Sequence, residues 1–270
     1  MIAFPHCKVN IGLDVLRKRP DGYHDIETVM YPVRGLCDSL EIVPAADGAQ
    51  TPVLTVSGAL SECSPQDNIV MKAWRLMHEA YGIGGVRMHL HKSVPSGAGL
   101  GGGSADGAFA LRMLDSLFAL ETDAGHLECM ALALGSDVPF FLHDAPQLCS
   151  GRGETMRPAP IDLKGWWMVL VKPAVSVSTA EAYAGITPRM PEEPLSERLA
   201  RPMNTWREAV ANDFEPTVFA AHPELAAVKR KLYEAGARYA SMSGSGSALY
   251  GLFADLPDYP AGKGVFVLQL

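Results

Sequence analysis

The sequence has no long hydrophobic run, and this shortage narrows the class of protein. Its longest clearly apolar stretch, residues 166–171, is far shorter than the roughly 20 residues that a membrane-spanning helix needs. The first residues do not combine a basic segment with a longer apolar one, as a secretory signal would. We therefore expect a cytoplasmic protein with no membrane partner.

Cysteines are few and widely spaced. The chain has five, which is an odd number, and no C-x-x-C pair. Such a pattern argues against both a disulfide framework and a structural zinc site. We expect reduced thiols at Cys7, Cys37, Cys63, Cys129 and Cys149.

Basic residues are outnumbered by acidic ones. The 23 lysines and arginines against 30 aspartates and glutamates give a net charge of −7. An acidic surface does not attract nucleic acid, so we expect no nucleic-acid partner. We expect the protein to be a monomer or a weak homodimer. A phosphate-bearing substrate would need a local site. Hydrophobic residues make up 48%, which is ordinary for a globular enzyme.

The hydrophobic pattern predicts strands and helices without regular alternation. Strict alternation in residues 86–91 is typical of a half-exposed strand in an antiparallel sheet. Residues 189–202, rich in proline and charge, predict a surface loop. The mixture favours an α+β fold, with domains 1–160 and 161–270. The expected strands are 3–16, 26–33, 39–43, 53–57, 86–91, 166–172, 238–242, 248–253 and 264–269. The expected helices are one that begins at Asp67 or Asn68 and ends at Gly82, then 104–119, 124–134, 178–184, 204–219 (in one or two pieces) and 223–235.

The most specific local feature is a glycine-rich loop between a patterned strand and a helix predicted to begin at Ser104. Its five glycines bring backbone N–H groups close to a ligand. The start of the helix adds N–H groups without intrahelical partners and the positive end of the helix dipole. This combination predicts a phosphate site. The loop consists of Pro95, Ser96, Gly97, Ala98, Gly99, Leu100, Gly101, Gly102, Gly103, Ser104 and Ala105.

Other phosphate motifs fit this loop less well. The spacing Gly97-x-Gly99-x-x-Gly102 matches a dinucleotide fingerprint. However, the preceding strand alternates and ends near a proline, whereas the first strand of a dinucleotide-binding fold is an unbroken apolar run. A Walker A loop is excluded because no lysine follows Gly103, and the H-R-D and D-F-G motifs of protein kinases are absent.

Three motifs in order resemble those of the GHMP kinases, a family of small-molecule kinases. They are Lys8-Val-Asn10-Ile-Gly-Leu, the loop P-S-G-A-G-L-G-G-G-S-A, and Met242-Ser-Gly-Ser-Gly-Ser-Ala248. The resemblance implies a two-domain fold with the active site in the cleft between domains, ATP as co-substrate and Mg²⁺. The segments Arg19-Pro-Asp-Gly-Tyr-His24, Gly135-Ser-Asp-Val-Pro-Phe-Phe141 and Gly151-Arg-Gly-Glu154 are similar to those of the branch that phosphorylates a cytidine-diphosphate alcohol in the non-mevalonate route to isoprenoid precursors.

The resemblance also implies roles for single residues in catalysis and substrate binding. It makes Asp137 the base that accepts the proton of the substrate hydroxyl, and Lys8 a cation that keeps this aspartate ionised. Asn10, on the same strand face as Lys8, is expected to bond substrate. The residues expected to hold the cytosine are Tyr23, His24, Thr179 and Tyr183, with Tyr23 and Tyr183 as the two walls.

The adenine and phosphate contacts come from the same resemblance. Asn68 and Lys92 occupy positions that are similar to nucleotide contacts in the family. The loop from Pro95 to Ala105 is expected to hold the triphosphate, with Ser104 bonding a phosphate oxygen or Mg²⁺. No carboxylate pair stands out as a metal site, so the metal ligands are not assigned.

Three other functions compete with this interpretation. One is a different GHMP kinase with a small alcohol such as mevalonate or homoserine as substrate. A second is a dinucleotide-dependent oxidoreductase, which the fingerprint spacing would allow. The third is a relative that binds nucleotide without catalysis, which the presence of both Lys8 and Asp137 disfavours.

Overall fold

The structure, a computed structural model, describes residues 1–46, 49–58 and 64–270, which form two compact units. Unit 1 comprises Met1–Cys7, Leu36–Ser96 and Gly101–Asp144. Unit 2 comprises Lys8–Gly35, Gly97–Leu100 and Ala145–Leu270. Cys63 lies outside the described residues. The domain boundary near residue 160 stays a prediction, because compactness does not show which segment folds alone.

Unit 1 contains a four-stranded sheet in the order β1-β4-β6-β5. Side chains of β6 alternate between buried and exposed along the whole strand, as its sequence predicted. β6 pairs antiparallel with β4 but parallel with β5, so the expectation of a purely antiparallel sheet is wrong on one side. The strands are β1 (Ile2–Ala3), β4 (Ser39–Pro44), β5 (Val53–Gly58) and β6 (Val86–Lys92).

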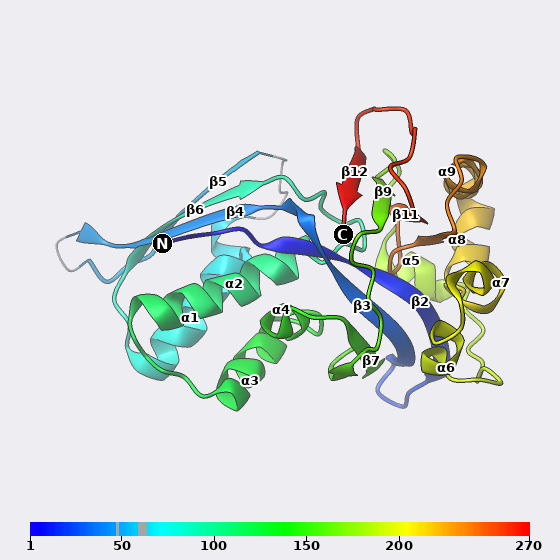
Figure 1. The fold of residues 1–270 in the computed structure, drawn as a ribbon. Coiled ribbons are helices and arrows are strands. Elements are labelled where there is room, and N and C mark those ends of the chain that lie inside the picture. The colour runs from blue at the N-terminus through cyan, green and yellow to red at the C-terminus, as the bar shows by residue number, and fades with distance from the viewer. Residues whose placement is uncertain (47–48, 59–63) are drawn as a thin grey trace. The chain divides into compact units, whose positions relative to one another are not determined.

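The helices of unit 1 gather beside this sheet (Figure 1), and α1 and α2 pack against each other. Asn68 begins α1, since its side-chain oxygen accepts from the N–H of Val70 at 2.9 Å, and Gly82 ends it in the left-handed conformation. Gly107 lets α2 approach α1, because a Cβ there would meet Ile69. The helical elements are η2 (Pro65–Asp67), α1 (Ile69–Tyr81), α2 (Gly102–Leu117), α3 (Ala124–Leu134) and α4 (Phe140–His143).

Unit 2 contains two sheets, in the orders β2-β3-β7-β8 and β10-β11-β9-β12. All printed pairings within them are antiparallel. β7 and β8 were not predicted, because each is short and a tight turn separates them. The strands are β2 (His6–Lys18), β3 (His24–Cys37), β7 (Gln147–Gly151), β8 (Thr155–Pro158), β9 (Trp167–Val171), β10 (Tyr239–Met242), β11 (Leu249–Phe253) and β12 (Val265–Gln269).

Short helices complete unit 2. The prediction of a loop over residues 189–202 is wrong in part, because α6 forms there and buries Leu195 and Leu199. The helix predicted over 204–219 is broken into separate pieces, as the sequence allowed. The helical elements are α5 (Thr179–Ala184), α6 (Leu195–Leu199), η3 (Met203–Thr205), α7 (Trp206–Ala209), α8 (Glu215–Ala221) and α9 (Pro223–Glu234).

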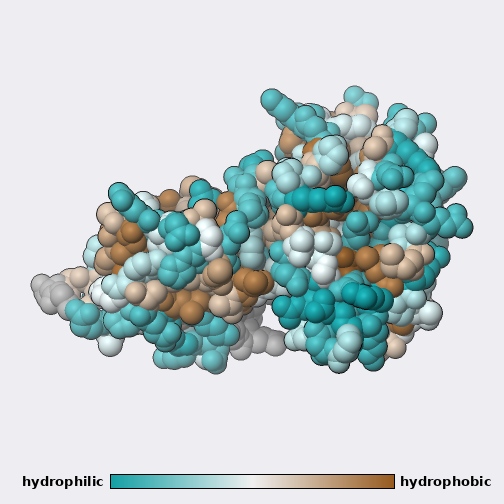
Figure 2. Space-filling model, turned by 90° about the horizontal axis from the view of Figure 1, so that it is seen from below, coloured by the Kyte–Doolittle hydropathy of each residue, from teal (hydrophilic) through white to brown (hydrophobic). Residues whose placement is uncertain are grey.

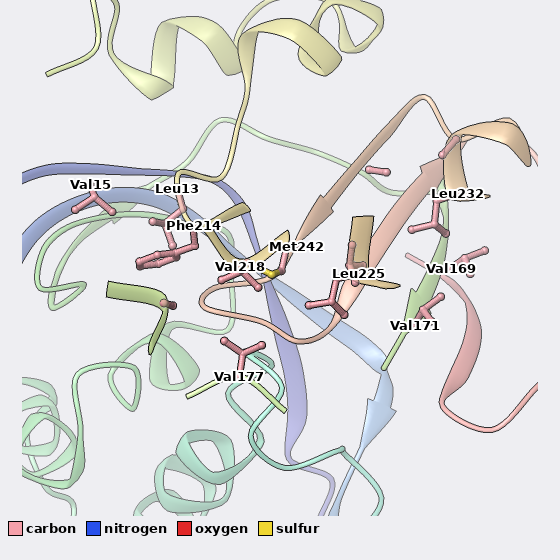
Figure 3. Close-up of a cluster of buried hydrophobic side chains, with 14 of the residues drawn as sticks. Leu13, Val15, Val169, Val171, Val177, Phe214, Val218, Leu225, Leu232 and Met242 are labelled. Atoms are coloured by element: carbon pink, nitrogen blue, oxygen red, sulfur yellow. The ribbon is translucent and has the colours of Figure 1, made fainter. Parts of the chain in front are cut away.

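A hydrophobic core joins the elements of unit 2 (Figure 3). α9 packs on β10 and β11, and Leu225 and Leu232 point from it into a cluster that also contains Val169, Phe214 and Met242. Burial of such side chains contributes roughly 1.5–3 kcal/mol each. Figure 2 shows apolar and hydrophilic residues interspersed over one face of the molecule, as is usual for protein surfaces.

Candidate active site

The first and third motifs meet part of the glycine-rich loop inside unit 2. Lys8 donates from its ammonium to the side-chain oxygen of Asn10 and, at 3.0 Å, to the carbonyl of Gly99. Ser243 donates to the same Gly99 carbonyl at 2.8 Å and accepts from the backbone N–H of Asn10 at 3.2 Å. Three segments that lie far apart in the sequence are therefore joined around Lys8.

Two glycines make this approach possible. Gly99 has a φ of 74° and Gly244 a φ of 56°, both in the region that favours glycine. A Cβ on Gly99 would overlap the carbonyl oxygen of Ser243, and one on Gly244 would lie 3.2 Å from the side-chain oxygen of Asn10. Gly99 is therefore required for the close contact with the third motif, and the left-handed backbone at Gly244 favours glycine there as well.

Two residues that the sequence analysis missed hold the third motif. Asn212 donates from its side-chain amide to the carbonyls of Met242 and Gly244, at 2.8 and 2.9 Å. Glu215 accepts from the N–H of Met242 at 2.9 Å and from Lys229 at 2.5 Å. Both side chains are buried. A glutamate at the start of a helix is usually read as a favourable end charge, so no sequence signal marked this role.

The residues expected to bind a base lie near one another in unit 2, and the expected role of Tyr23 and Tyr183 as the two walls stays a prediction. His24, not Tyr23, stacks on Tyr183, with ring centroids 4.7 Å apart and planes at 20°. Tyr23 has 58% of its surface exposed. The guanidinium of Arg152, from the turn between β7 and β8, lies 5.1 Å from the Tyr23 ring centroid. No role was predicted for Arg152, although it lies in the segment Gly151-Arg-Gly-Glu154, which resembles the family.

Charged pairs shape the turn that presents Tyr23 and His24. Arg19 bonds the carboxylates of Asp21 and Asp25, and Asp21 also accepts from the backbone N–H of Tyr23 at 3.1 Å. The hydrogen bond from Arg19 lowers the pKa of Asp21, and hydrogen bonds from Arg17 and Arg19 lower the pKa of Asp25. Thr179, at the start of α5, is exposed, and its hydroxyl lies 3.4 Å from that of Ser245 in the third motif.

The helix after the loop begins at Gly102, two residues before the predicted start at Ser104. Its N-cap is Gly101 with a φ of 69°, and the structure shows no side-chain hydrogen bond to this helix end. The first N–H groups of a helix have no intrahelical partner. A Cβ on Gly103 would meet nothing within 4 Å. This end of α2 in unit 1 is therefore suited to an anion.

A buried charge cluster lies under this helix start in unit 1. Lys92 donates to Asp38 and, at 2.6 Å, to Asp106 on α2. Asp38 also accepts from the backbone N–H groups of Ser93 and Val94, at 2.6 and 2.8 Å, just before the loop. All three charged side chains are at most 6% exposed. The ammonium expected to contact nucleotide is thus held by two carboxylates.

Burial governs the ionisation of the cluster. It raises the pKa of Asp106 to about 7, and Lys92 only partly opposes this rise. Burial disfavours the charge of Lys92, but the two aspartates outweigh it and raise the pKa of Lys92. One oxygen of Asp106 is buried with no hydrogen-bond partner among the described residues. An acidic residue on the apolar face of α2 was the signal that the sequence analysis overlooked.

The remaining predicted residues lie in unit 1. Asp137 is half-buried in the turn between α3 and α4. It belongs to a different unit from Lys8, so the expected pairing of the two stays a prediction. Asn68 uses its side-chain oxygen to begin α1, and a nucleotide contact there stays a prediction as well.

The described residues contain neither a metal-binding cluster nor a helix that could span a membrane. No group of three or more histidine, cysteine, aspartate or glutamate residues is arranged to hold a metal ion in the part of the chain that the structure describes. Within the same residues, no helix has the length and apolar character needed to cross a membrane.

Family models match both halves of the chain. The model of the GHMP kinases N terminal domain matches residues 68–145, and that of the GHMP kinases C terminal region matches residues 195–259. The chain belongs to the GHMP kinases. It is therefore an ATP-dependent kinase with the GHMP kinase fold, and both sequence-based predictions are confirmed.

Curated GHMP kinases resemble the chain along its full length. A protein of Bacteroides thetaiotaomicron named 4-diphosphocytidyl-2-C-methyl-D-erythritol kinase is 45% identical, covering 100% of this chain and 99% of the relative. A protein of the same name from Cytophaga hutchinsonii is 41% identical over 96% of this chain and 94% of its own length. A crystal structure of 4-(cytidine 5'-diphospho)-2C-methyl-D-erythritol kinase superposes with a TM-score of 0.76 at 35% identity, covering 93% and 90% of the two chains.

Proposed function

We propose that this GHMP kinase transfers the γ-phosphoryl group of ATP to the 2-hydroxyl of 4-diphosphocytidyl-2-C-methyl-D-erythritol. The products are the 2-phosphate and ADP, in the synthesis of isoprenoid precursors by the non-mevalonate route. The observation that carries the proposal is the 45% identity over the whole chain to a relative of that name. Solved homoserine and mevalonate kinases are only 18% and 13% identical, which supports the shared fold alone.

The uncapped start of α2 supports a site for the triphosphate. Backbone N–H groups there carry the positive end of the helix dipole, and Gly97 and Gly103 have open space beside them. We assign the triphosphate to the loop from Pro95 to Ala105, with Ser104 bonding a phosphate oxygen. Such a site binds by position and charge, which is what phosphoryl transfer mainly requires.

The transfer needs one proton acceptor. In the proposed reaction Asp137 takes the proton of the 2-hydroxyl, and the hydroxyl oxygen forms a bond to the γ-phosphorus. The bond from this phosphorus to the bridging β–γ oxygen breaks, and ADP leaves with the electron pair. Lys8, held between Asn10 and the Gly99 carbonyl, would keep Asp137 ionised and steer the hydroxyl. Its positive charge would also stabilise the charge of the transferred group.

We assign the cytosine to the aromatic group of unit 2. Tyr23 offers an exposed ring face, and the stacked pair of His24 and Tyr183 offers a polar edge and a wall. Stacking a base on an aromatic ring contributes roughly 1–3 kcal/mol. Thr179 is placed to bond the sugar or the diphosphate. A cytidine-containing substrate suits these residues better than mevalonate or homoserine, which have no ring to stack.

Mg²⁺ is part of the proposal. Among the described residues no acidic cluster could hold it alone, so the phosphate oxygens of ATP would be its main ligands, with the Ser104 hydroxyl as a protein ligand. The ion would neutralise charge on the phosphate oxygens. A cytoplasmic location, the absence of a nucleic-acid partner, and a monomeric or weakly dimeric state stay predictions.

One experiment tests the proposal directly. The protein is incubated with Mg-ATP and a panel containing 4-diphosphocytidyl-2-C-methyl-D-erythritol, mevalonate and homoserine, and ADP and a mass gain of one phosphoryl group are measured. We expect the gain on the cytidine compound alone. Phosphorylation of mevalonate or homoserine instead would contradict the proposed substrate.

A variant pair tests the proton acceptor. Asp137→Asn should keep ATP affinity but lose most turnover, because the amide cannot accept the proton. Asp123→Asn is the matched control, since Asp123 only caps α3 through an oxygen that accepts from His126 and the amide keeps that oxygen. Unchanged turnover in Asp137→Asn would remove Asp137 as the base.

A further inference from the structure

Thr28 lies in the middle of β3 and outside the three motifs. Its side chain is completely buried. The hydroxyl donates to the carbonyl of Gly12 at 2.6 Å. A carbonyl can only accept, so the single hydroxyl proton of Thr28 is used in this bond. Whatever else approaches the Thr28 oxygen must therefore donate to it.

The side-chain amide of Asn10 is that donor. Its nitrogen donates to the Thr28 oxygen at 3.1 Å, which turns the amide oxygen of Asn10 toward the Lys8 ammonium. If the amide were reversed, its oxygen would face an oxygen with no proton left, and its N–H₂ group would face an ammonium. The Thr28 oxygen and the Lys8 ammonium therefore both favour the orientation in which the amide oxygen of Asn10 faces Lys8.

The rest of Asn10 is held in place by backbone contacts. Its N–H donates to Ser243 at 3.2 Å, and its carbonyl accepts from the buried hydroxyl of Tyr250 at 2.8 Å. Because the backbone is restrained, a rotation of the side-chain amide is the motion that would remove the Asn10 oxygen from the Lys8 ammonium. The Thr28 hydroxyl restrains that rotation at the amide nitrogen, while the Lys8 ammonium and the Ser243 hydroxyl, at 3.5 Å, bond the amide oxygen.

We infer that Thr28 is a positioning residue for phosphoryl transfer, whose hydroxyl orients the Asn10 amide so that its oxygen holds the Lys8 ammonium in place. This inference rests on the proposed role of Lys8 at the transferred phosphate. Thr28 itself touches neither substrate nor nucleotide in this scheme. Its effect should therefore appear in turnover rather than in ATP binding.

The test compares Thr28→Val, which keeps the shape but removes the hydroxyl, with Thr28→Ser, which keeps the hydroxyl. In Thr28→Val the Asn10 amide nitrogen loses its bond to the hydroxyl, and we expect the Asn10 oxygen to lose its bond to the Lys8 ammonium as a consequence. Loss of that second bond, which involves a charged group, lowers kcat by about 10- to 100-fold when the charge acts in the transition state. We expect that loss in Thr28→Val, with the KM for ATP within about twofold of wild type. Thr28→Ser should keep turnover within about threefold of wild type.

A double variant separates positioning from a general structural effect. In a Lys8→Met background, Thr28→Val should cause no further loss of kcat, because the group that it positions is gone. Additive losses would overturn the inference. Thr217→Val is the matched control, since Thr217 also donates to a backbone carbonyl, that of Gly185 at 3.2 Å, but lies outside the proposed site.

The outcome distinguishes this inference from the proposed function. Failure of the wild type to phosphorylate the cytidine compound contradicts the proposed function, and turnover is then measured with whichever alcohol the protein accepts. Crystal structures of the wild type and Thr28→Val need no substrate. We expect the Lys8 ammonium to leave the Asn10 oxygen in the variant, and an unmoved ammonium would overturn the inference. Should Thr28→Val not fold, Thr28→Cys, with a weak donor of similar size, replaces it with the same expected loss.

Discussion

Replacing Lys92 with methionine tests whether this lysine holds the fold or the nucleotide. The side chain keeps its length and apolar stem but loses the ammonium that bonds Asp38 and Asp106. Both carboxylates are at most 2% exposed, so water cannot replace the lost cation. Lys92→Met should therefore destabilise unit 1.

The size of the effect follows from the burial of the pair. Removing one partner of a buried ion pair costs about 3–5 kcal/mol. For a chain of this length, 1 kcal/mol lowers Tm by about 2–4 °C, so Tm should fall by about 6–20 °C. The loss should be larger at pH 8 than at pH 6, because burial raises the pKa of Asp106 to about 7, so that near pH 6 this carboxyl group can take up a proton and its repulsion with Asp38 falls.

Differential scanning calorimetry at both pH values measures the change in Tm. Lys72→Met is the control, because Lys72 is exposed on α1 and its removal should change stability by at most about 0.5 kcal/mol. A Tm within 2 °C of wild type, together with a raised KM for ATP, would refute the structural role and favour a nucleotide contact.

Three further predictions concern the loop, the base site and pH. Tyr23→Ala should raise the KM for the cytidine substrate by about 5- to 150-fold and leave that for ATP unchanged, whereas equal effects on both would contradict stacking. Gly99→Ala should abolish turnover and lower Tm, because its Cβ overlaps the Ser243 carbonyl, while Gly97→Ala, with open space around it, should cost only about 1–2 kcal/mol. Burial raises the pKa of Asp106 from 3.8 to about 7, so its protonated form stabilises the fold below pH 4, and this contribution is lost as pH rises toward 7. The free energies of unfolding of wild type and Asp106→Asn, measured in urea, should therefore diverge by up to about 4 kcal/mol over this range. The same pH dependence of unfolding free energy in both proteins would contradict the raised pKa.

Local patterns in the sequence predicted the elements whose ends carry their own signals. α1 begins at Asn68 and ends at Gly82, and α3 spans the predicted residues. The start of α2 was misplaced because Ser104 is a residue type that often caps helices, while Gly101 caps this one through a left-handed backbone. β7 and β8 gain their stability from pairing with β3 and with each other, which a short segment does not reveal.

The residues of the candidate site also fall into those that the sequence predicted and those that it did not. Motif order predicted Lys8, Asn10, Gly99 and the third motif, and the structure brings them together. The supporting residues depend on contacts between distant segments. Thr28 and Asp38 bond Asn10 and Lys92 across 18 and 54 positions of sequence. A single polar residue on a strand, such as Thr28, or between two strands, such as Asp38, gives no local signal of such partners.

The bare start of α2 has a consequence for local order. With glycine at its N-cap and no side chain bonding it, the first turn of this helix lacks the side-chain hydrogen bond that serine or aspartate would supply there, which is worth a few tenths of a kcal/mol relative to glycine. A bound triphosphate would stabilise the first turn in place of a capping side chain. Deuterium uptake at Gly102, Gly103 and Ser104 should then be fast in the apo protein and slow with ATP, so this turn reports nucleotide occupancy.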